Sequence, residues 1–143
     1  MIEDRFYVEP AVWSVDSAAL KAIRTVVFIE EQNVPEREEW DVDDPSADHA
    51  LARTPTGEAI GTGRLTSDGR IGRMAVDRSV RGAQWGRQLL DALVDAARAR
   101  GDAEVQLHAQ RSAEGFYRRA GFAVVGEPYE EAGIAHIAMA RKL

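Results

Sequence analysis

The sequence predicts an α/β protein in which a twisted mixed β-sheet carries helices on both faces, in the order β-α-β-β-β-α-β-α-β-β. Short segments of alternating apolar and polar residues are typical of strands. They flank two longer segments in which apolar residues recur every three or four positions, as in helices. The 143 residues contain no internal repeat and no Pro/Gly/Ser-rich linker, so we expect residues 1–143 to form a single domain.

The first half of the chain predicts one strand, one helix and a three-stranded meander. Alternation over residues 6–13 predicts the first strand. Asp16 is the predicted N-cap of a helix with an apolar stripe that continues to about Gln32. Residues 33–48 are polar and acidic, which indicates a loop or an irregular turn of helix. The meander strands are predicted over residues 49–53, 59–66 and 71–76.

The second half predicts two helices and three strands. A helix with an apolar face runs from about Gln84 to Arg100 and ends at Gly101, because glycine is the usual residue after a helix C-terminus. The other predicted elements are a strand over 104–109, a short helix over 112–120, and strands over 122–125 and 134–140.

Composition excludes several classes of function. A net charge of −6 argues against a general nucleic-acid binder, which needs an excess of Lys and Arg to neutralise phosphates. The absence of cysteine excludes disulfides, thiolate metal sites and a cysteine nucleophile. No apolar run approaches the roughly 18 residues of a membrane span, and the acidic N-terminus does not look like a signal peptide. We therefore expect a cytoplasmic protein that binds neither membranes nor nucleic acid.

The junction between strand 71–76 and the next helix is a candidate anion site. The first N–H groups of a helix lack intrahelical partners and favour a phosphate, and Gly82 and Gly86 have no Cβ to keep it away. Arg81 and Arg87 add positive charge. The alternative is an ordinary strand-to-helix turn. The P-loop pattern does not fit, because Gly86 is followed by Arg-Gln. Gly61-Thr62-Gly63 resembles the start of a dinucleotide-binding fingerprint, but it lies within a predicted strand and opens no helix.

Residues 81–86, Arg-Gly-Ala-Gln-Trp-Gly, resemble the cofactor signature Arg/Gln-x-x-Gly-x-Gly/Ala of the GNAT superfamily of N-acetyltransferases, with Gln84 in place of the first glycine. Residues 113–122 resemble a second hallmark of this family, in which an aromatic pair, here Phe116-Tyr117, precedes Gly-Phe. Residues 24–35 are similar to the pattern Arg-x-x-Val-Phe-x-x-Glu-Gln-x-x-Pro of a small bacterial subgroup whose members mostly lack an assigned acceptor.

The resemblance implies acetyl-CoA as co-substrate, in a gap where the sheet splays between strands 71–76 and 104–109. Backbone N–H groups of the first of these strands would meet the thioester carbonyl. The cofactor-binding residues that it implies are Met74, Ala75, Val76, Arg81, Gly82, Ala83, Gln84, Trp85, Gly86, Arg87, Gln110, Ala113, Phe116 and Tyr117.

The implied reaction is direct attack of an amine on the thioester, with Tyr117 protonating or hydrogen-bonding the CoA sulfur. A tyrosine that only packs on the sheet is the alternative. Candidates for the general base are His108, His136, Glu31, Glu39 and Asp41.

The resemblance places the acceptor beside the first helix and the loop that follows, near Phe28, Glu31 and Asp41. Nine acidic residues between Glu30 and Asp48 predict a cationic or amine-bearing small molecule there, while a solvated acidic loop is the alternative.

Two other functions stay open, a non-catalytic acyl-CoA-binding module and an acyltransferase like the acyl-homoserine lactone synthases. We expect no metal site, because the three histidines are far apart in the sequence. The oligomeric state, a homodimer included, is left open.

Overall fold

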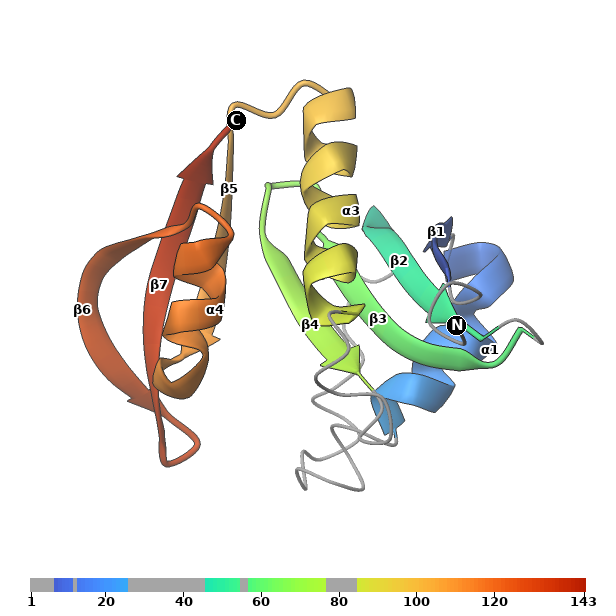
Figure 1. The fold of residues 1–143 in the computed structure, drawn as a ribbon, viewed down its shortest axis with the longest axis horizontal. Helices are drawn as coiled ribbons and strands as arrows, with labels where there is room; N and C mark the ends of the chain where they lie inside the picture. The colour runs from blue at the N-terminus through green and yellow to red at the C-terminus, as the bar shows by residue number, and fades with distance from the viewer. Residues whose placement is uncertain (1–6, 12, 26–45, 55–56, 77–84) are drawn as a thin grey trace.

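The computed structural model describes residues 7–11, 13–25, 46–54, 57–76 and 85–143, and its elements follow the predicted order (Figure 1). The elements are β1 (Tyr7–Ala11), α1 (Trp13–Arg24), β2 (Asp48–Arg53), β3 (Ala59–Leu65), β4 (Ile71–Val76), α3 (Trp85–Ala99), β5 (Glu104–Gln110), the 3-10 turn η5 (Arg111–Ala113), α4 (Glu114–Arg119), β6 (Ala123–Glu131) and β7 (Ile134–Lys142). No helix in these ranges is long and apolar enough to cross a bilayer.

The described strands form two antiparallel sheets, β1-β2-β3-β4 and β5-β7-β6. An isolated parallel bridge between Arg70 and Gln106 joins them, and the Gln106 N–H donates to the Gly69 carbonyl at 3.0 Å. Beyond this bridge β4 runs away from β5, as Figure 1 shows. The predicted splay between these two strands is therefore confirmed, and the parallel part of the predicted mixed sheet is this single bridge.

Helices α1 and α3 pack on opposite faces of the first sheet. Successive residues of β2 show this, because Ala50 and Ala52 belong to the core cluster under α3, whereas Leu51 belongs to the cluster under α1. The predicted apolar face of α3 is buried, with Leu89, Leu90, Leu93, Val94 and Ala97 all at most 1% exposed. Burial of such a face is the main source of helix stability in a folded protein.

Two glycines of β3 allow α3 to approach the sheet closely. A Cβ built on Gly61 would lie 2.9 Å from Leu89 Cδ1, and one on Gly63 would lie 2.7 Å from Leu93 Cδ1. Both distances are shorter than van der Waals contact, so only glycine fits under the helix without a shift. The Gly61-Thr62-Gly63 segment thus has a packing role.

The second sheet buries one face against α3 and α4 and exposes the other. Val105, Leu107 and Ala109 of β5 are buried in the same cluster as Phe122, and Phe116 and Tyr117 of α4 pack against that cluster. The intervening residues of β5 point to the opposite, exposed face.

Several predicted boundaries were wrong. The first predicted strand included Trp13, which is the first residue of α1, and β7 continues to Lys142, beyond the predicted end at residue 140. Helix α1 begins at Trp13, so Asp16 lies in its first turn and not at the N-cap, and its carboxylate is 3.6 Å from the Arg53 guanidinium. Strand β6 continues to Glu131, beyond the predicted end at Val125. The register shifts between Val125 and Tyr129, and β6 lies at an edge of the described sheet, where a bulge and Pro128 are tolerated. The predicted continuation of α1 to Gln32 lies outside the described residues.

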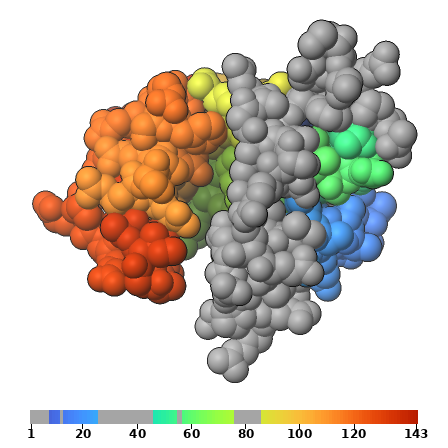
Figure 2. Space-filling model, turned by 60° about the horizontal axis from the view of Figure 1, so that its bottom comes forward, coloured from blue at the N-terminus to red at the C-terminus, as the bar shows by residue number. Residues whose placement is uncertain are grey.

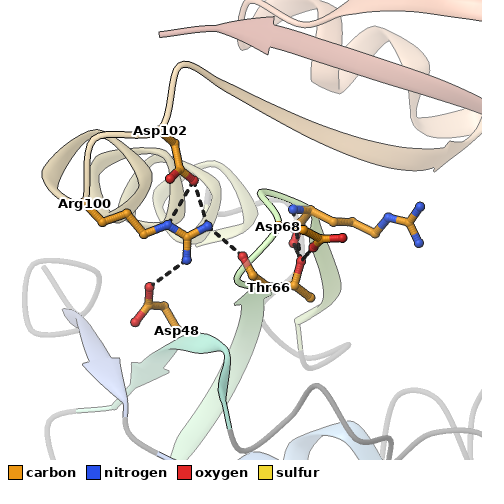
Figure 3. A network of polar contacts seen from close by, with 6 residues as sticks. Asp48, Thr66, Asp68, Arg100 and Asp102 are labelled. Atoms are coloured by element: carbon orange, nitrogen blue, oxygen red, sulfur yellow. Dashed lines mark hydrogen bonds and ion pairs between the residues drawn. The ribbon is translucent and has the colours of Figure 1, made fainter.

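Arg100 ties the C-terminal end of α3 to the first sheet (Figure 3). Its guanidinium donates to the Thr66 carbonyl at 2.6 Å and to the Asp102 carboxylate at 2.7 Å, and it pairs with Asp48 at 3.2 Å. Thr66 begins the turn between β3 and β4, so this network sets the position of α3 relative to the strand that leads to the candidate site.

Candidate functional site

The candidate site lies where β4 and β5 diverge. The strands meet at Arg70 and Gln106 and separate toward their C-terminal ends, Val76 and Gln110. Figure 2 turns this end of the molecule toward the reader, with α4 and the C-terminal strands in orange and red on one side and the first sheet in green on the other. Two of the predicted cofactor segments, Met74 to Val76 and Gln110, therefore lie on the two strands that open here.

Strand β4 carries a bulge at this opening. Thr62 pairs with Ala75 and Arg64 pairs with Gly72, so two steps along β3 correspond to three along β4. Within this extra step Arg73 has a φ of 51°, which is unusual for a residue with a side chain. A bulge leaves backbone N–H and C=O groups outside the hydrogen-bond pattern of the sheet. Residues with unusual backbone angles, such as Arg73, often occur at active sites. The amides next to Met74 are thus suited to meet a carbonyl oxygen of a ligand.

The N-terminal turn of α3 contacts α4. A Cβ on Gly86 would lie 3.7 Å from Cζ of Phe116, which is ordinary contact distance. Nη1 of Arg87 donates to the Arg119 carbonyl at 3.4 Å, and its Nε pairs with Asp91 at 3.0 Å. The fold therefore brings the two sequence hallmarks together, and it directs Arg87 along α3 toward α4.

Tyr117 lies on α4 within an aromatic cluster. Its ring centroid is 5.0 Å from that of Phe116 and 6.0 Å from that of Phe122, both edge to face. Burial raises the pKa of the Tyr117 phenol above its usual value near 10, so the hydroxyl keeps its proton at neutral pH. It can therefore act as a proton donor.

The two candidate histidines lie together on the exposed face of the second sheet. Tyr129 of β6 connects them, because its hydroxyl hydrogen-bonds Nδ1 of His108 while its ring stacks on His136 at 5.7 Å. His136 in turn donates from Nδ1 to the Ile134 carbonyl at 2.8 Å. Burial, and then the positive charge of Arg70, lower the pKa of His108.

The histidines and Tyr117 lie on opposite faces of the second sheet. His108 alternates with the buried residues of β5, and His136 pairs with Gln110 at the open end of that strand. Tyr117 packs against the buried face. Tyr117 and the histidines are therefore on opposite sides of the sheet whose edge strand, β5, borders the gap.

Sequence reasoning missed Tyr129 and the bulge at Arg73. The predicted end of β6 at Val125 left Tyr129 out of the sheet, although a longer strand would have placed it opposite His136. The bulge has no local sequence signal, because it depends on how β3 and β4 pair.

The remaining predicted residues are placed as follows. Trp85 is the first residue of α3, and Ala113 ends η5 just before α4. The residues that lie outside the described ranges are Phe28, Glu31, Glu39, Asp41, Arg81, Gly82, Ala83 and Gln84.

Comparisons with known proteins agree with this geometry. The acetyltransferase (GNAT) domain family matches residues 17–143. ElaA of Escherichia coli is 36% identical over 133 residues, which cover 87% of this chain and 86% of that protein. The ElaA crystal structure has a TM-score of 0.84 at 31% identity, over 96% of this chain and 99% of that one. An acyl-CoA N-acyltransferase structure from Pseudomonas aeruginosa has a TM-score of 0.84 at 30% identity, over 95% and 99% of the two chains.

Proposed function

We propose that this chain, which belongs to the GNAT acetyltransferase family, transfers an acetyl group from acetyl-CoA to a primary amine of a small molecule or peptide. The observation that carries the proposal is the meeting of three parts at the opening between β4 and β5. These parts are the bulged strand at Arg73, the first turn of α3 at Gly86, and α4 with Tyr117.

These residues suit an acyl-CoA. The N-terminus of α3 would face the pyrophosphate, because free helix N–H groups and the helix dipole favour an anion. Met74 and Phe116 are partly buried apolar side chains that suit the pantetheine arm. The P. aeruginosa relative is named for an acyl-CoA donor, which also supports this assignment.

Each part of the site would have a separate role. When bound, acetyl-CoA supplies a thioester carbon for the amine to attack. A backbone N–H of β4 beside the bulge would donate to the carbonyl oxygen as negative charge develops there. The protonated Tyr117 would hydrogen-bond or protonate the departing sulfur. A histidine of the exposed face would take the proton of the amine.

The acceptor is proposed to be cationic, because the acidic segment between Glu30 and Asp48 would attract it, although most of that segment lies outside the described residues. We also propose that the protein works in the cytoplasm, where acetyl-CoA is available.

A combined binding and turnover experiment tests the proposal. Acetyl-CoA is expected to raise the Tm by mass action. In a panel of polyamines, amino acids, aminoglycosides and peptide N-termini, at least one amine should be acetylated by the protein, with release of CoA as the measured signal. A Tm rise without turnover across the panel would favour the acyl-CoA-binding module. An unchanged Tm would contradict the cofactor assignment.

A further inference from the structure

We propose that His136 is the general base of this site and that its Nε2 atom accepts the proton of the acceptor ammonium. This inference rests on the proposed acetyl transfer and decides between the two histidines that share the exposed face of the second sheet.

The hydrogen-bond partners of the two histidines differ in kind. A carbonyl oxygen can only accept, so the 2.8 Å bond from His136 to Ile134 requires a proton on Nδ1. In the neutral ring the other nitrogen, Nε2, then carries a bare lone pair. The partner of His108 is the Tyr129 hydroxyl, which can donate or accept and therefore selects no tautomer. The backbone thus prepares His136 as a proton acceptor and leaves His108 undetermined.

The ring of His136 is also held in place. It stacks on Tyr129 with an interplanar angle of 23°, and Tyr129 is opposite it in the β6–β7 register. On its other side, His136 pairs with Gln110, the last residue of β5, so it lies one strand away from the gap, at the end where β4 and β5 are separated. A base whose ring is held by a stacked neighbour and a backbone hydrogen bond loses little freedom on reaction, which favours catalysis.

The charged and titratable groups that face this cluster come from three elements. His108 lies on β5, Tyr129 and Glu131 lie on β6, and Arg70 lies at the turn before β4. Arg70 and His136 both lower the pKa of His108, whereas Glu131 raises it. A neutral His108 next to His136 avoids a second positive charge when His136 takes a proton.

The proton balance of the step follows from this assignment. The ammonium gives one proton to Nε2 of His136, and the amine lone pair forms the C–N bond as the C–S bond breaks. Tyr117 gives its proton to the departing sulfur and regains the second proton of the amine. The imidazolium then releases its proton to water, so the products are the amide, the thiol and one proton.

The matched substitutions His136→Asn and His108→Asn test the proposal, with acetyl-CoA and the amine of the panel that turns over fastest. The asparagine amide at 136 can still donate to Ile134, so the fold is kept while the Nε2 base is removed. His136→Asn is expected to lower kcat/KM by about 10²-fold or more. His108→Asn should lose far less activity.

A measurement on the unliganded protein separates this inference from the acetyl-transfer proposal. Imidazole ¹⁵N chemical shifts, assigned by comparison with His136→Asn, should show His136 with a protonated Nδ1 and a bare Nε2. The opposite tautomer, or full activity of His136→Asn in a protein that acetylates amines, overturns the assignment of His136. Absence of turnover by the wild-type protein overturns the acetyl-transfer proposal itself, and the assignment with it. An acetyl-CoA-induced Tm rise equal to that of the wild type excludes misfolding of the variant.

Discussion

Tyr117 illustrates how single residues acquire their chemistry from neighbours. Its ring is held edge to face between Phe116 and Phe122, and burial keeps its hydroxyl protonated well into the alkaline range by raising the pKa. His136 is the counterpart on the other face of the sheet, where one backbone carbonyl selects the tautomer. In both cases the surroundings determine which atom holds the proton, and the roles of donor and acceptor are proposed from that.

We predict that Tyr117→Phe lowers kcat by about 10²-fold while the affinity for acetyl-CoA changes little. The phenyl ring keeps the contacts with Phe116 and Phe122, so only the proton donor is lost. Steady-state kinetics with the best amine, together with the acetyl-CoA-induced Tm rise, measure the two effects separately. An unchanged kcat would make Tyr117 a packing residue.

The contact between α3 and α4 is the element-level feature on which the site depends. These helices come from separate parts of the sequence and meet at Gly86 and Phe116, next to the Arg87 bond to the Arg119 carbonyl. The contact sets the distance between the proposed pyrophosphate end of the site and the aromatic helix with Tyr117. A change of one side chain at this contact should therefore affect cofactor binding.

The variants Gly86→Ala and Gly86→Val test this contact. A Cβ at 3.7 Å from Phe116 is in ordinary contact, so alanine is expected to fold and to keep most of the Tm rise with acetyl-CoA. The two further methyl groups of valine would press on Phe116 and narrow the approach to the helix N-terminus. Gly86→Val should therefore lose the Tm rise. If acetyl-CoA raised the Tm of both variants equally, this turn would not be part of the cofactor site.

At the scale of the whole molecule, two sheets share a core beneath α3 and α4 and part at one edge. Arg100 stabilises this arrangement, because it joins the end of α3 to Asp48 at the start of β2, to the Thr66 carbonyl after β3 and to Asp102 before β5 (Figure 3). Its side chain is only 26% exposed, so these bonds are partly shielded from water.

We predict that Arg100→Met lowers the free energy of unfolding by roughly 1–3 kcal/mol, because the Thr66 carbonyl and two carboxylates lose their donor. Arg98→Met is the matched control, since Arg98 pairs at 3.3 Å with Asp95 on the exposed side of the same helix. That control should change stability by roughly 0–1 kcal/mol. Chemical denaturation measures both, and equal losses would show that Arg100 contributes no more than a surface ion pair.

Local patterns determined the order of elements and the family hallmarks. Helix α3 and strand β5 could be predicted from the leucine stripe, the stop at Gly101 and the alternation of apolar and polar residues, because these patterns depend only on residues close together in the sequence. Asp16 and the end of β6 were predicted wrongly because local patterns were not sufficient there. Asp16 matches the N-cap preference although the helix begins at Trp13, and the end of β6 depends on its pairing with β7.

The amino-acid sequence by itself therefore determined the α/β order, and its resemblance to the family predicted the cofactor turn and the proton donor Tyr117. Only the tertiary structure decided that the β4 bulge lies at Arg73, that Gly86 meets Phe116, and that Tyr129 joins His108 to His136. The physical reason is that these features depend on strand register and on contacts between residues distant in the chain. Such contacts form when the core is buried as a whole, and no single segment encodes them.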